Sequence, residues 1–193
     1  MAVDIIYETH CVTADNAAGV ISGWGDPELS EEGRRGAAEL GARRRDAGAA
    51  AVYTSDFRRA VQTARIAFAD TGTPVRTDRR LRECNYGDLN GCTVAQLDAA
   101  RPGHVDVPFP GGGQSFRQVL EATAEFLDEL AEQHDGGLVV VIAHSANKWA
   151  LDCLLDGAVL EELVARPFVW RDGWRYRLDA AQWRAAAAAR NRG

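Results

Sequence analysis

The sequence predicts an α/β fold with a mostly parallel central sheet covered by helices on both faces. Short β-rich runs at residues 3–7, 50–54, 75–77 and 138–143 alternate with segments of helical spacing. The run 138–143 is apolar on both faces, as expected for a central parallel strand. Right-handed crossovers between such strands place the connecting helices on both faces of the sheet.

Helix signals occupy the stretches between the strands. Side chains that can cap a helix N-terminus stand at Ser30, at Ser55 or Asp56, and at Ser115. These signals predict helices over residues 30–45, 55–69 and 115–134, and a further helix is expected over 146–155. The segments 168–170 and 174–178 flank an Asp-Gly pair, which predicts a β-hairpin.

Length and composition indicate one globular domain with an acidic balance. The chain has 193 residues, of which 46% are hydrophobic, and a formal net charge of −6. This charge argues against nucleic acid or an anionic membrane as a general partner, and no apolar run reaches the roughly 20 residues that span a bilayer. We expect a single domain over 1–193, with a cap-like insert at about 83–116 that sets specificity and a C-terminal tail at about 180–193.

Cysteine usage and the two chain ends bear on location and partners. The four cysteines are scattered and no two form a CxxC pair, so a reduced, intracellular state is favoured over a disulfide framework. The N-terminus runs directly into the first strand-like segment with no signal-peptide pattern, which predicts a cytoplasmic location. The Ala- and Arg-rich tail is expected to be a helix that frays, with a basic interaction arm as the alternative.

Two histidines stand directly after predicted strands. His10 follows the strand over 3–7, and His144 follows the strand over 138–143. Ligands of open α/β sheets bind outside the carboxyl ends of the strands, so both imidazoles can face one pocket if the two strands are neighbours. Two histidines in equivalent positions make a functional site as well supported as two unrelated polar residues at strand ends, and both interpretations stay open here.

Charged residues elsewhere in the chain add candidate chemistry. Arg59 begins the helix after the second strand, where a guanidinium and a helix N-terminus together make an anion site. Arg58 beside it could take the same part. Glu83 lies in an irregular segment and is a candidate general acid, although on local sequence alone an exposed loop glutamate is the simpler interpretation.

Six short motifs follow one another along the chain, at residues 7–16, 23 with 29–33, 53–64, 81–87 with 90–91, 110–115 and 140–144. In this order and spacing they resemble the histidine phosphatase superfamily, also called phosphoglycerate-mutase-like. The resemblance covers nearly the whole chain to about residue 178. It implies a phosphoglycerate-mutase-like fold and catalysis through a phosphohistidine.

The resemblance also implies roles for individual residues. His10 would attack phosphorus, while His144 and Arg59 would stabilise the charged phosphoryl oxygens. Glu83 would protonate the leaving oxygen and then activate water. The residues expected to bind the substrate and its phosphate, besides Arg59, are Thr9, Asn16, Gln114, Ser115 and Ser145. No metal and no other cofactor is implied.

Three positions depart from the family pattern. The family has Arg-His-Gly where this chain has Thr9-His10-Cys11, and glycine usually follows the second histidine where this chain has Ser145. Thr9 keeps a hydroxyl donor but lacks a fixed positive charge. Because a charge-assisted hydrogen bond is worth about 1.5–3 kcal/mol, phosphate binding should weaken by about ten- to a hundredfold unless Lys148 or Arg82 compensates.

Together these features predict a metal-independent phosphatase that hydrolyses a small phosphomonoester through a phosphohistidine intermediate. A mutase is less favoured, because mutases of the family are generally longer. Two alternatives stay open: a divergent family member with a non-phosphatase reaction on a biosynthetic intermediate, and a non-catalytic module that binds a phosphorylated ligand. Retention of both a nucleophile and an acid favours catalysis.

Cysteine and tryptophan each allow a second interpretation. Cys11 and Cys84 adjoin two proposed catalytic residues and, with the two histidines, could make a zinc site; small hydrophobic filler is favoured. The five tryptophans could line a subunit contact, as in a homodimer, or fill the core, and the core is favoured.

Overall fold

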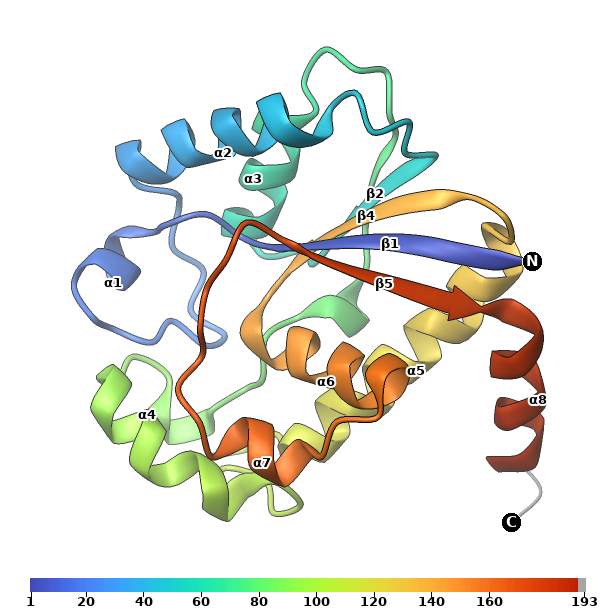
Figure 1. Ribbon diagram of the computed structural model, residues 1–193. Helices are drawn as coiled ribbons and strands as arrows, with labels where there is room; N and C mark the ends of the chain where they lie inside the picture. The colour runs from blue at the N-terminus through green and yellow to red at the C-terminus, as the bar shows by residue number, and fades with distance from the viewer. Residues whose placement is uncertain (191–193) are drawn as a thin grey trace.

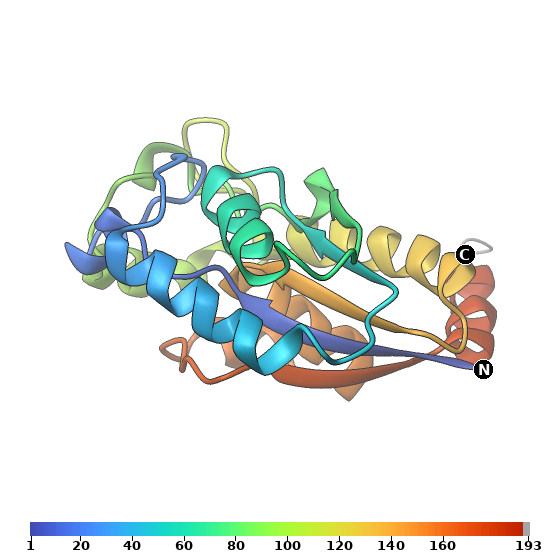
Figure 2. The ribbon, with the colours of Figure 1, turned by 90° about the horizontal axis from the view of Figure 1, so that it is seen from above.

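The computed structural model describes residues 1–190, which build a five-stranded sheet between two layers of helices (Figures 1 and 2). The strand order is β3-β2-β4-β1-β5. β1 pairs with β4, β4 with β2 and β2 with β3, all in parallel, whereas β5 lies antiparallel on β1. The strands are β1 Ala2–Thr9, β2 Ala51–Thr54, β3 Val75–Thr77, β4 Leu138–Ala143 and β5 Trp174–Asp179. This arrangement confirms the predicted fold class.

Helices α2 and α3 cover one face of the sheet, and α5 and α6 cover the other (Figure 1). The α-helices are α1 Ala14–Ala17, α2 Glu31–Arg44, α3 Arg58–Ala67, α4 Val94–Ala100, α5 Phe116–Gln133, α6 Ser145–Asp156, α7 Leu160–Val164 and α8 Ala180–Arg190. Three short 3-10 turns are η1 Arg79–Leu81, η2 Gly87–Leu89 and η3 Arg101–His104. No helix among residues 1–190 is long and apolar enough to cross a membrane.

Strand β4 is central because its side chains feed two separate cores. Val139 and Val141 pack with the α5 side, while Val140 and Ile142 pack with the α3 side. All four side chains are at most 1% exposed. Complete burial of a Val or Ile side chain contributes about 1.5–3 kcal/mol, so β4 fixes its two neighbours firmly in the sheet. The uninterrupted apolar run was the sequence signal for this position.

Close backbone approach holds the chain after β1 against α2. Ser30 caps α2 by accepting a hydrogen bond from the Gly33 N–H. A Cβ at Gly33 would lie 1.9 Å from the Val12 carbonyl oxygen, so only glycine permits this contact. The loop that begins at His10 is therefore anchored two residues further along, which limits its freedom to move.

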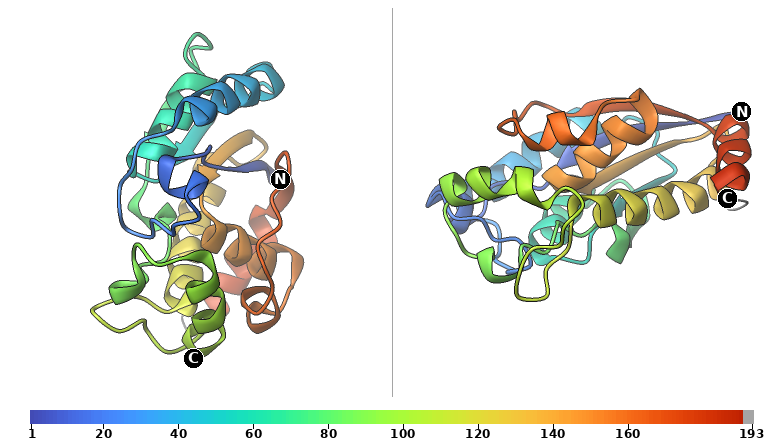
Figure 3. Two further views of the ribbon diagram at one scale, coloured as in Figure 1. Left: turned by 90° about the vertical axis from the view of Figure 1, so that its left-hand side faces the viewer. Right: turned by 90° about the horizontal axis from the view of Figure 1, so that it is seen from below.

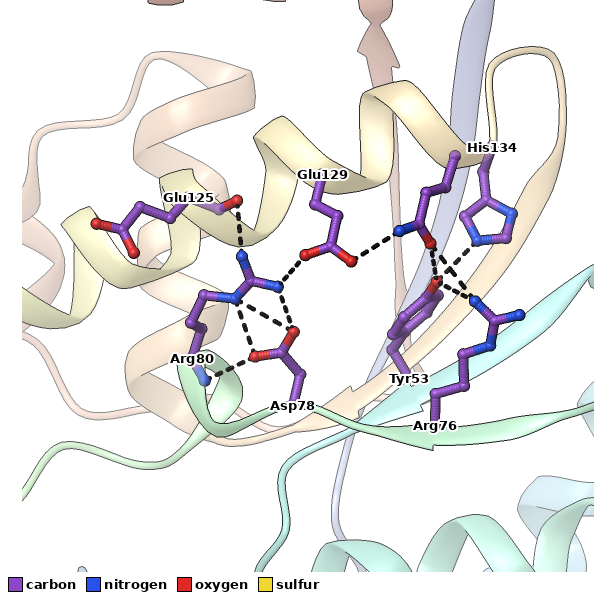
Figure 4. A network of polar contacts seen from close by, with 8 residues as sticks. Tyr53, Arg76, Asp78, Arg80, Glu125, Glu129 and His134 are labelled. Atoms are coloured by element: carbon purple, nitrogen blue, oxygen red, sulfur yellow. Dashed lines mark hydrogen bonds and ion pairs between the residues drawn. The ribbon is translucent and has the colours of Figure 1, made fainter.

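A polar network fastens β3 and the turn after it to α5 (Figure 4). Arg80 pairs with Glu129 at 2.6 Å and with Asp78 at 2.5 Å. The Tyr53 hydroxyl lies 2.8 Å from His134 Nε2 at the end of α5. These contacts hold the edge of the sheet that carries β2, whose carboxyl end supplies part of the candidate site.

Two local predictions are wrong, and both errors have physical reasons. Residues 168–170 form no strand, because β5 finds its partner in β1 and no β-hairpin forms. The helix after β2 begins at Arg58 with Phe57 at its N-cap and no side-chain cap, although Ser55 or Asp56 was expected there. Both polar side chains are used elsewhere: Ser55 contacts His144, and Asp56 pairs with Arg82.

The chain after residue 83 and the C-terminal tail add smaller features. Residues 83–116 contain η2, α4 and η3, and their apolar side chains join Trp149 of α6 in a hydrophobic cluster separate from the cores beside the sheet. Helix α8 packs on α5, and Trp183 is 7% exposed. Residues 191–193 of the predicted tail lie outside the described residues.

The core interpretation of the tryptophans holds for Trp149, Trp174 and Trp183, whereas Trp24 and Trp170 are exposed. The homodimer and the cytoplasmic location stay predictions.

Candidate active site

The two candidate histidines meet at the carboxyl end of the sheet. β1 and β4 are parallel neighbours with Thr9 opposite Ala143, so the next residue of each strand, His10 and His144, emerges at the same edge. The ring centroids are 5.1 Å apart and the rings are tilted by 57°. Figure 3 (left) views the molecule from this end, with α1 and α4 in front.

A cavity of about 710 Å³ opens at this edge. It is bordered by the chain after β1, by α2, by α4 and by the segment 167–172 before β5. Seven of the nine predicted site residues line it, namely Thr9, His10, Asn16, Arg59, Glu83, His144 and Ser145. The sequence pattern therefore located the cavity and the polar residues around its histidine pair.

Hydrogen bonds fix the tautomer of His10. Its Nδ1 lies 2.8 Å from the Cys11 carbonyl oxygen, which can only accept, so Nδ1 carries the proton. Nε2 is then an acceptor, and the Arg59 Nε–H donates to it at 3.3 Å. The lone pair of Nε2 is therefore directed toward the guanidinium of Arg59. A phosphorus atom could not reach a lone pair that pointed into the protein core.

Arg59 is a buried and rigidly held cation. Its side chain is 1% exposed, and its two terminal nitrogens each donate at 2.8 Å to the carbonyls of Gly25 and Gly23. The guanidinium also lies 4.7 Å above the Phe57 ring. Arg58, the alternative from sequence, is instead an exposed residue that pairs with Asp26 at 3.3 Å.

His144 presents one ring nitrogen that has no protein partner among the described residues. Its Nε2 lies 2.7 Å from the Ser55 hydroxyl, and its carbonyl accepts from the Tyr7 hydroxyl. Its Nδ1 is buried without a hydrogen bond. A buried polar atom without a partner is costly, and His144 lines the cavity. This nitrogen is therefore suited to contact an oxygen of a bound ligand.

Burial keeps both imidazoles neutral. Desolvation, with the Arg59 charge as the second cause, lowers the pKa of His10 to about 3, while the hydrogen bond to Cys11 opposes this shift. The same two causes, followed by His10, hold the pKa of His144 well below its ordinary value. A neutral imidazole is the form that can act as a nucleophile, so His10 is available as one throughout the physiological pH range.

Glu83 is held at the N-terminus of α6. Its carboxylate accepts from the Ser145 hydroxyl at 2.9 Å, the Cys84 N–H at 2.9 Å and the Ala146 N–H at 3.3 Å. The residue is 8% exposed, so the exposed-loop interpretation is wrong. The serine that replaces the usual glycine after the second histidine orients this carboxyl group.

Thr9 and Asn16 face the cavity with part of their polar groups already used. The Thr9 hydroxyl accepts from the Trp170 indole N–H at 3.1 Å and keeps its own proton free to donate. The Asn16 Oδ1 accepts from the Thr13 backbone N–H in the capping box of α1. The side-chain NH₂ of Asn16 can therefore donate a hydrogen bond to a ligand.

Gln114 and Ser115 do not line the cavity, which corrects the prediction that they contact substrate. Gln114 Oε1 accepts from the Asn85 backbone N–H at 3.1 Å. Ser115 is 2% exposed and caps α5 in a capping box with Gln118. Both side chains organise the backbone of the 83–116 segment instead.

Lys148 and Arg82 do not supply the positive charge that is missing at position 9, where the family has arginine and this chain has Thr9. Lys148 pairs with Asp152 of its own helix and lies 5.2 Å above the Trp174 ring. Arg82 pairs with Asp56 at 2.6 Å. Neither lines the cavity. Arg59 is thus the one guanidinium that contacts the histidine pair among the described residues.

The cysteines beside the site are protonated. Burial raises the pKa of Cys11 to about 11 and raises that of the fully buried Cys84 thiol further. Cys11 lines the cavity beside Gly36 of α2. No cluster of three or more His, Cys, Asp or Glu side chains suited to a metal ion occurs within residues 1–190.

Sequence reasoning missed Ser55, Tyr7 and Trp170. Ser55 follows β2 in the same way that His10 follows β1, so its place at the carboxyl edge was a usable signal. The Tyr7 hydroxyl donates to the backbone carbonyl of His144, which is 137 positions away in the sequence. Trp170 lies in a segment of irregular structure. The contacts of Tyr7 and Trp170 with site residues arise only in the tertiary structure.

Comparison with known proteins decides the family. Residues 9–183 match the pattern of the histidine phosphatase superfamily (branch 1). The chain belongs to the histidine phosphatase superfamily. It is similar to phosphoglycerate mutase-like protein 4 of Arabidopsis thaliana, with 33% identity over 151 residues, which cover 73% of this chain and 66% of the relative.

Phosphatases are prominent among the relatives of this superfamily member. Glucosyl-3-phosphoglycerate phosphatase of Mycolicibacterium vanbaalenii is 36% identical over 170 residues, covering 79% of this chain and 74% of the relative. The solved structure of a mycobacterial glucosyl-3-phosphoglycerate phosphatase superposes with a TM-score of 0.76 at 29% identity, over 92% of this chain and 90% of the other. Family membership and these relatives support the predicted enzyme class, a phosphoric monoester hydrolase.

The neutral state of His10 can be measured directly. We expect the ring carbon and nitrogen chemical shifts of His10 to stay at neutral-imidazole values from about pH 8 to about pH 5, because the pKa is lowered to about 3. The unfolded chain protonates near pH 6.5, so the contribution of His10 to stability decreases as the pH falls from about 6.5 to about 3. Signals are assigned with a His10→Gln variant. A His10 midpoint above pH 6 contradicts the described burial.

Proposed function

We propose that this protein is a metal-independent phosphatase that hydrolyses a small phosphomonoester through a phosphohistidine at His10. The observation that supports it is the meeting of two neutral imidazoles, 5.1 Å apart, with the buried guanidinium of Arg59 against His10 Nε2. Relatives named glucosyl-3-phosphoglycerate phosphatase and metal-independent phosphoserine phosphatase support hydrolysis.

In the first step, His10 Nε2 attacks phosphorus and the bond to the leaving oxygen breaks. The phosphoryl group binds where the Arg59 Nε–H now donates to His10, so that this donor turns to a phosphoryl oxygen. With the Ser55 hydroxyl donating to His144 Nε2, the proton of this ring is on Nδ1, and the otherwise unpartnered Nδ1–H donates to a second oxygen. Glu83 gives its proton to the leaving oxygen, which departs as an alcohol.

In the second step, water hydrolyses the phosphohistidine. Glu83, now ionised, removes a proton from the attacking water, and the P–N bond breaks to return the electron pair to His10 Nε2. The hydrogen bond from His10 Nδ1 to the Cys11 carbonyl stabilises the positive charge that forms on the ring when Nε2 is phosphorylated. Inorganic phosphate then leaves and the original protonation states are restored.

The segment 83–116 serves in this proposal as the cap. It contributes Glu83 and, through α4 and η3, further residues to the cavity wall. Because α4 lies across the cavity from the β1 edge, the leaving group binds between α4 and the histidine pair. The cap therefore decides which alcohol the enzyme accepts.

Substitution of His10 tests the covalent route. We expect His10→Ala to lower kcat/KM for a phosphomonoester by about a thousandfold or more, because no other group replaces the nucleophile. The wild type, quenched rapidly during turnover, carries acid-labile phosphate on His10. The matched control is His134→Ala, which removes a histidine outside the cavity and keeps kcat/KM. Full activity of His10→Ala, or an active wild type without phosphohistidine, excludes the mechanism.

Substitution of Thr9 tests the missing charge. Because a charge-assisted hydrogen bond contributes about 1.5–3 kcal/mol, Thr9→Arg should lower the inhibition constant of inorganic phosphate by about ten- to a hundredfold. Thr9→Val is the matched control, since it removes the acceptor of the Trp170 indole without adding charge. Inhibition that is equally strong in wild type and Thr9→Arg shows that another group already supplies the charge.

A further inference from the structure

The part of the cavity beyond the histidine pair has an apolar surface. Ile21, Val94, Leu97, Phe168 and Trp170 all line it. Val94 is 45% exposed and Trp170 is 60% exposed, so part of this apolar lining is open to solvent. The hydrogen bond to Thr9 holds the Trp170 indole in this place. Exposed apolar surface at a cavity mouth marks a binding surface for an apolar group.

The cation on the cap side of the cavity is neutralised. Arg101 of η3 is 5% exposed and pairs with Asp98 of α4 at 2.7 Å. Its guanidinium also donates to the Arg166 carbonyl at 3.2 Å and lies 5.2 Å above the Trp149 ring. Asp98 and Arg101 both line the cavity. The Arg101 Nε is buried without a partner and can donate one hydrogen bond, but the ion pair leaves no net positive charge on this wall.

Carboxylates accompany the cations on the α2 side as well. Arg43 pairs with Asp172 at 3.2 Å. Arg35 is preceded by Glu32 at three residues and followed by Glu39 at four, which places both carboxylates beside it on the same face of α2. All five of these side chains line the cavity. A second anion on the substrate would meet carboxylates here at least as often as guanidinium groups.

Acidic groups outnumber basic ones by four to three in the part of the cavity wall that the leaving group would meet. The guanidinium groups there are those of Arg35, Arg43 and Arg101, and the carboxyl groups are those of Glu32, Glu39, Asp98 and Asp172. Glu8 is not counted, because Arg44 neutralises it at 2.7 Å, and Glu83 is not counted, because it acts on the leaving oxygen. Only Arg59 lies against the histidine pair, where the phosphoryl group binds. We propose that the substrate is a phosphomonoester whose leaving group has an apolar body and carries no second anionic group. This inference rests on the proposed phosphatase function.

Three matched substrates test the inference on the full-length wild type: phenyl phosphate, 3-carboxyphenyl phosphate and 3-(aminomethyl)phenyl phosphate. The ring and the reacting phosphate are the same, and the three differ in the charge of one substituent. We expect kcat/KM for the carboxyphenyl compound to be at least about tenfold below that for phenyl phosphate, because carboxylates in the wall repel it. The aminomethyl compound should match or exceed phenyl phosphate.

Removal of one carboxylate should shift this preference. Asp98→Asn leaves the Arg101 charge without a counter-ion, so the ratio of kcat/KM for carboxyphenyl to phenyl phosphate should rise at least about fivefold. Glu32→Gln on the exposed face of α2 should raise the same ratio and serves if Asp98→Asn does not fold. The control is Asp106→Asn, which removes a carboxylate of the 83–116 segment that pairs with Arg117 outside the cavity and should leave the ratio unchanged.

The outcomes separate the inference from the proposal on which it rests. Wild-type kcat/KM that is equal or higher for the carboxyphenyl compound overturns the inference while leaving a phosphatase. A ratio that the folded Asp98→Asn and Glu32→Gln variants do not change also overturns it, since the wall charges then do not discriminate. If none of the three compounds is hydrolysed, the proposed function itself fails and the inference with it.

Discussion

The parallel pairing of β1 with β4 is the constraint on which the site depends. It places Thr9 opposite Ala143 and thereby brings His10 and His144, which are far apart in sequence, to one edge of the sheet. The pairing is secured by a strand that is buried on both faces. A one-residue slip in register would turn one of the two rings away from the cavity. The chemistry of the site thus follows from the packing of the central strand.

The buried charge of Arg59 organises the polar groups around this edge. Burying a guanidinium is costly unless its donors are satisfied, and here the carbonyls of Gly23 and Gly25 accept two of them. A third donor, the Nε–H, points to His10. The same charge helps to keep both imidazoles neutral. One side chain therefore prepares both the nucleophile and the place where an anion is stabilised.

Sequence reasoning succeeded where a local pattern decides the structure. The apolar run of β4, the Ser115 cap of α5 and the two histidines after strands all carry their signal within a few residues. Prediction failed where a side chain has two competing uses. Ser55 looks like a helix cap and instead contacts His144, and Gln114 resembles a substrate ligand but holds the backbone of its own segment.

The two candidate cations differ in how far the sequence could decide their role. Lys148 pairs with Asp152 four residues along its own helix, a spacing that the sequence displays. Arg82 pairs with Asp56, and nothing within a few residues of Arg82 distinguishes this ion pair from a contact with phosphate. The antiparallel addition of β5 to β1 is a further long-range choice, because the Asp-Gly pair before it is equally compatible with a hairpin. Such features depend on which segments meet after folding.

A crystal structure of the protein soaked with orthovanadate tests the central claim most directly. The account predicts vanadium bonded to His10 Nε2, with the Arg59 guanidinium and His144 Nδ1 each contacting a vanadate oxygen. Vanadate bound elsewhere, or bound at this edge with no contact to either imidazole, would contradict it.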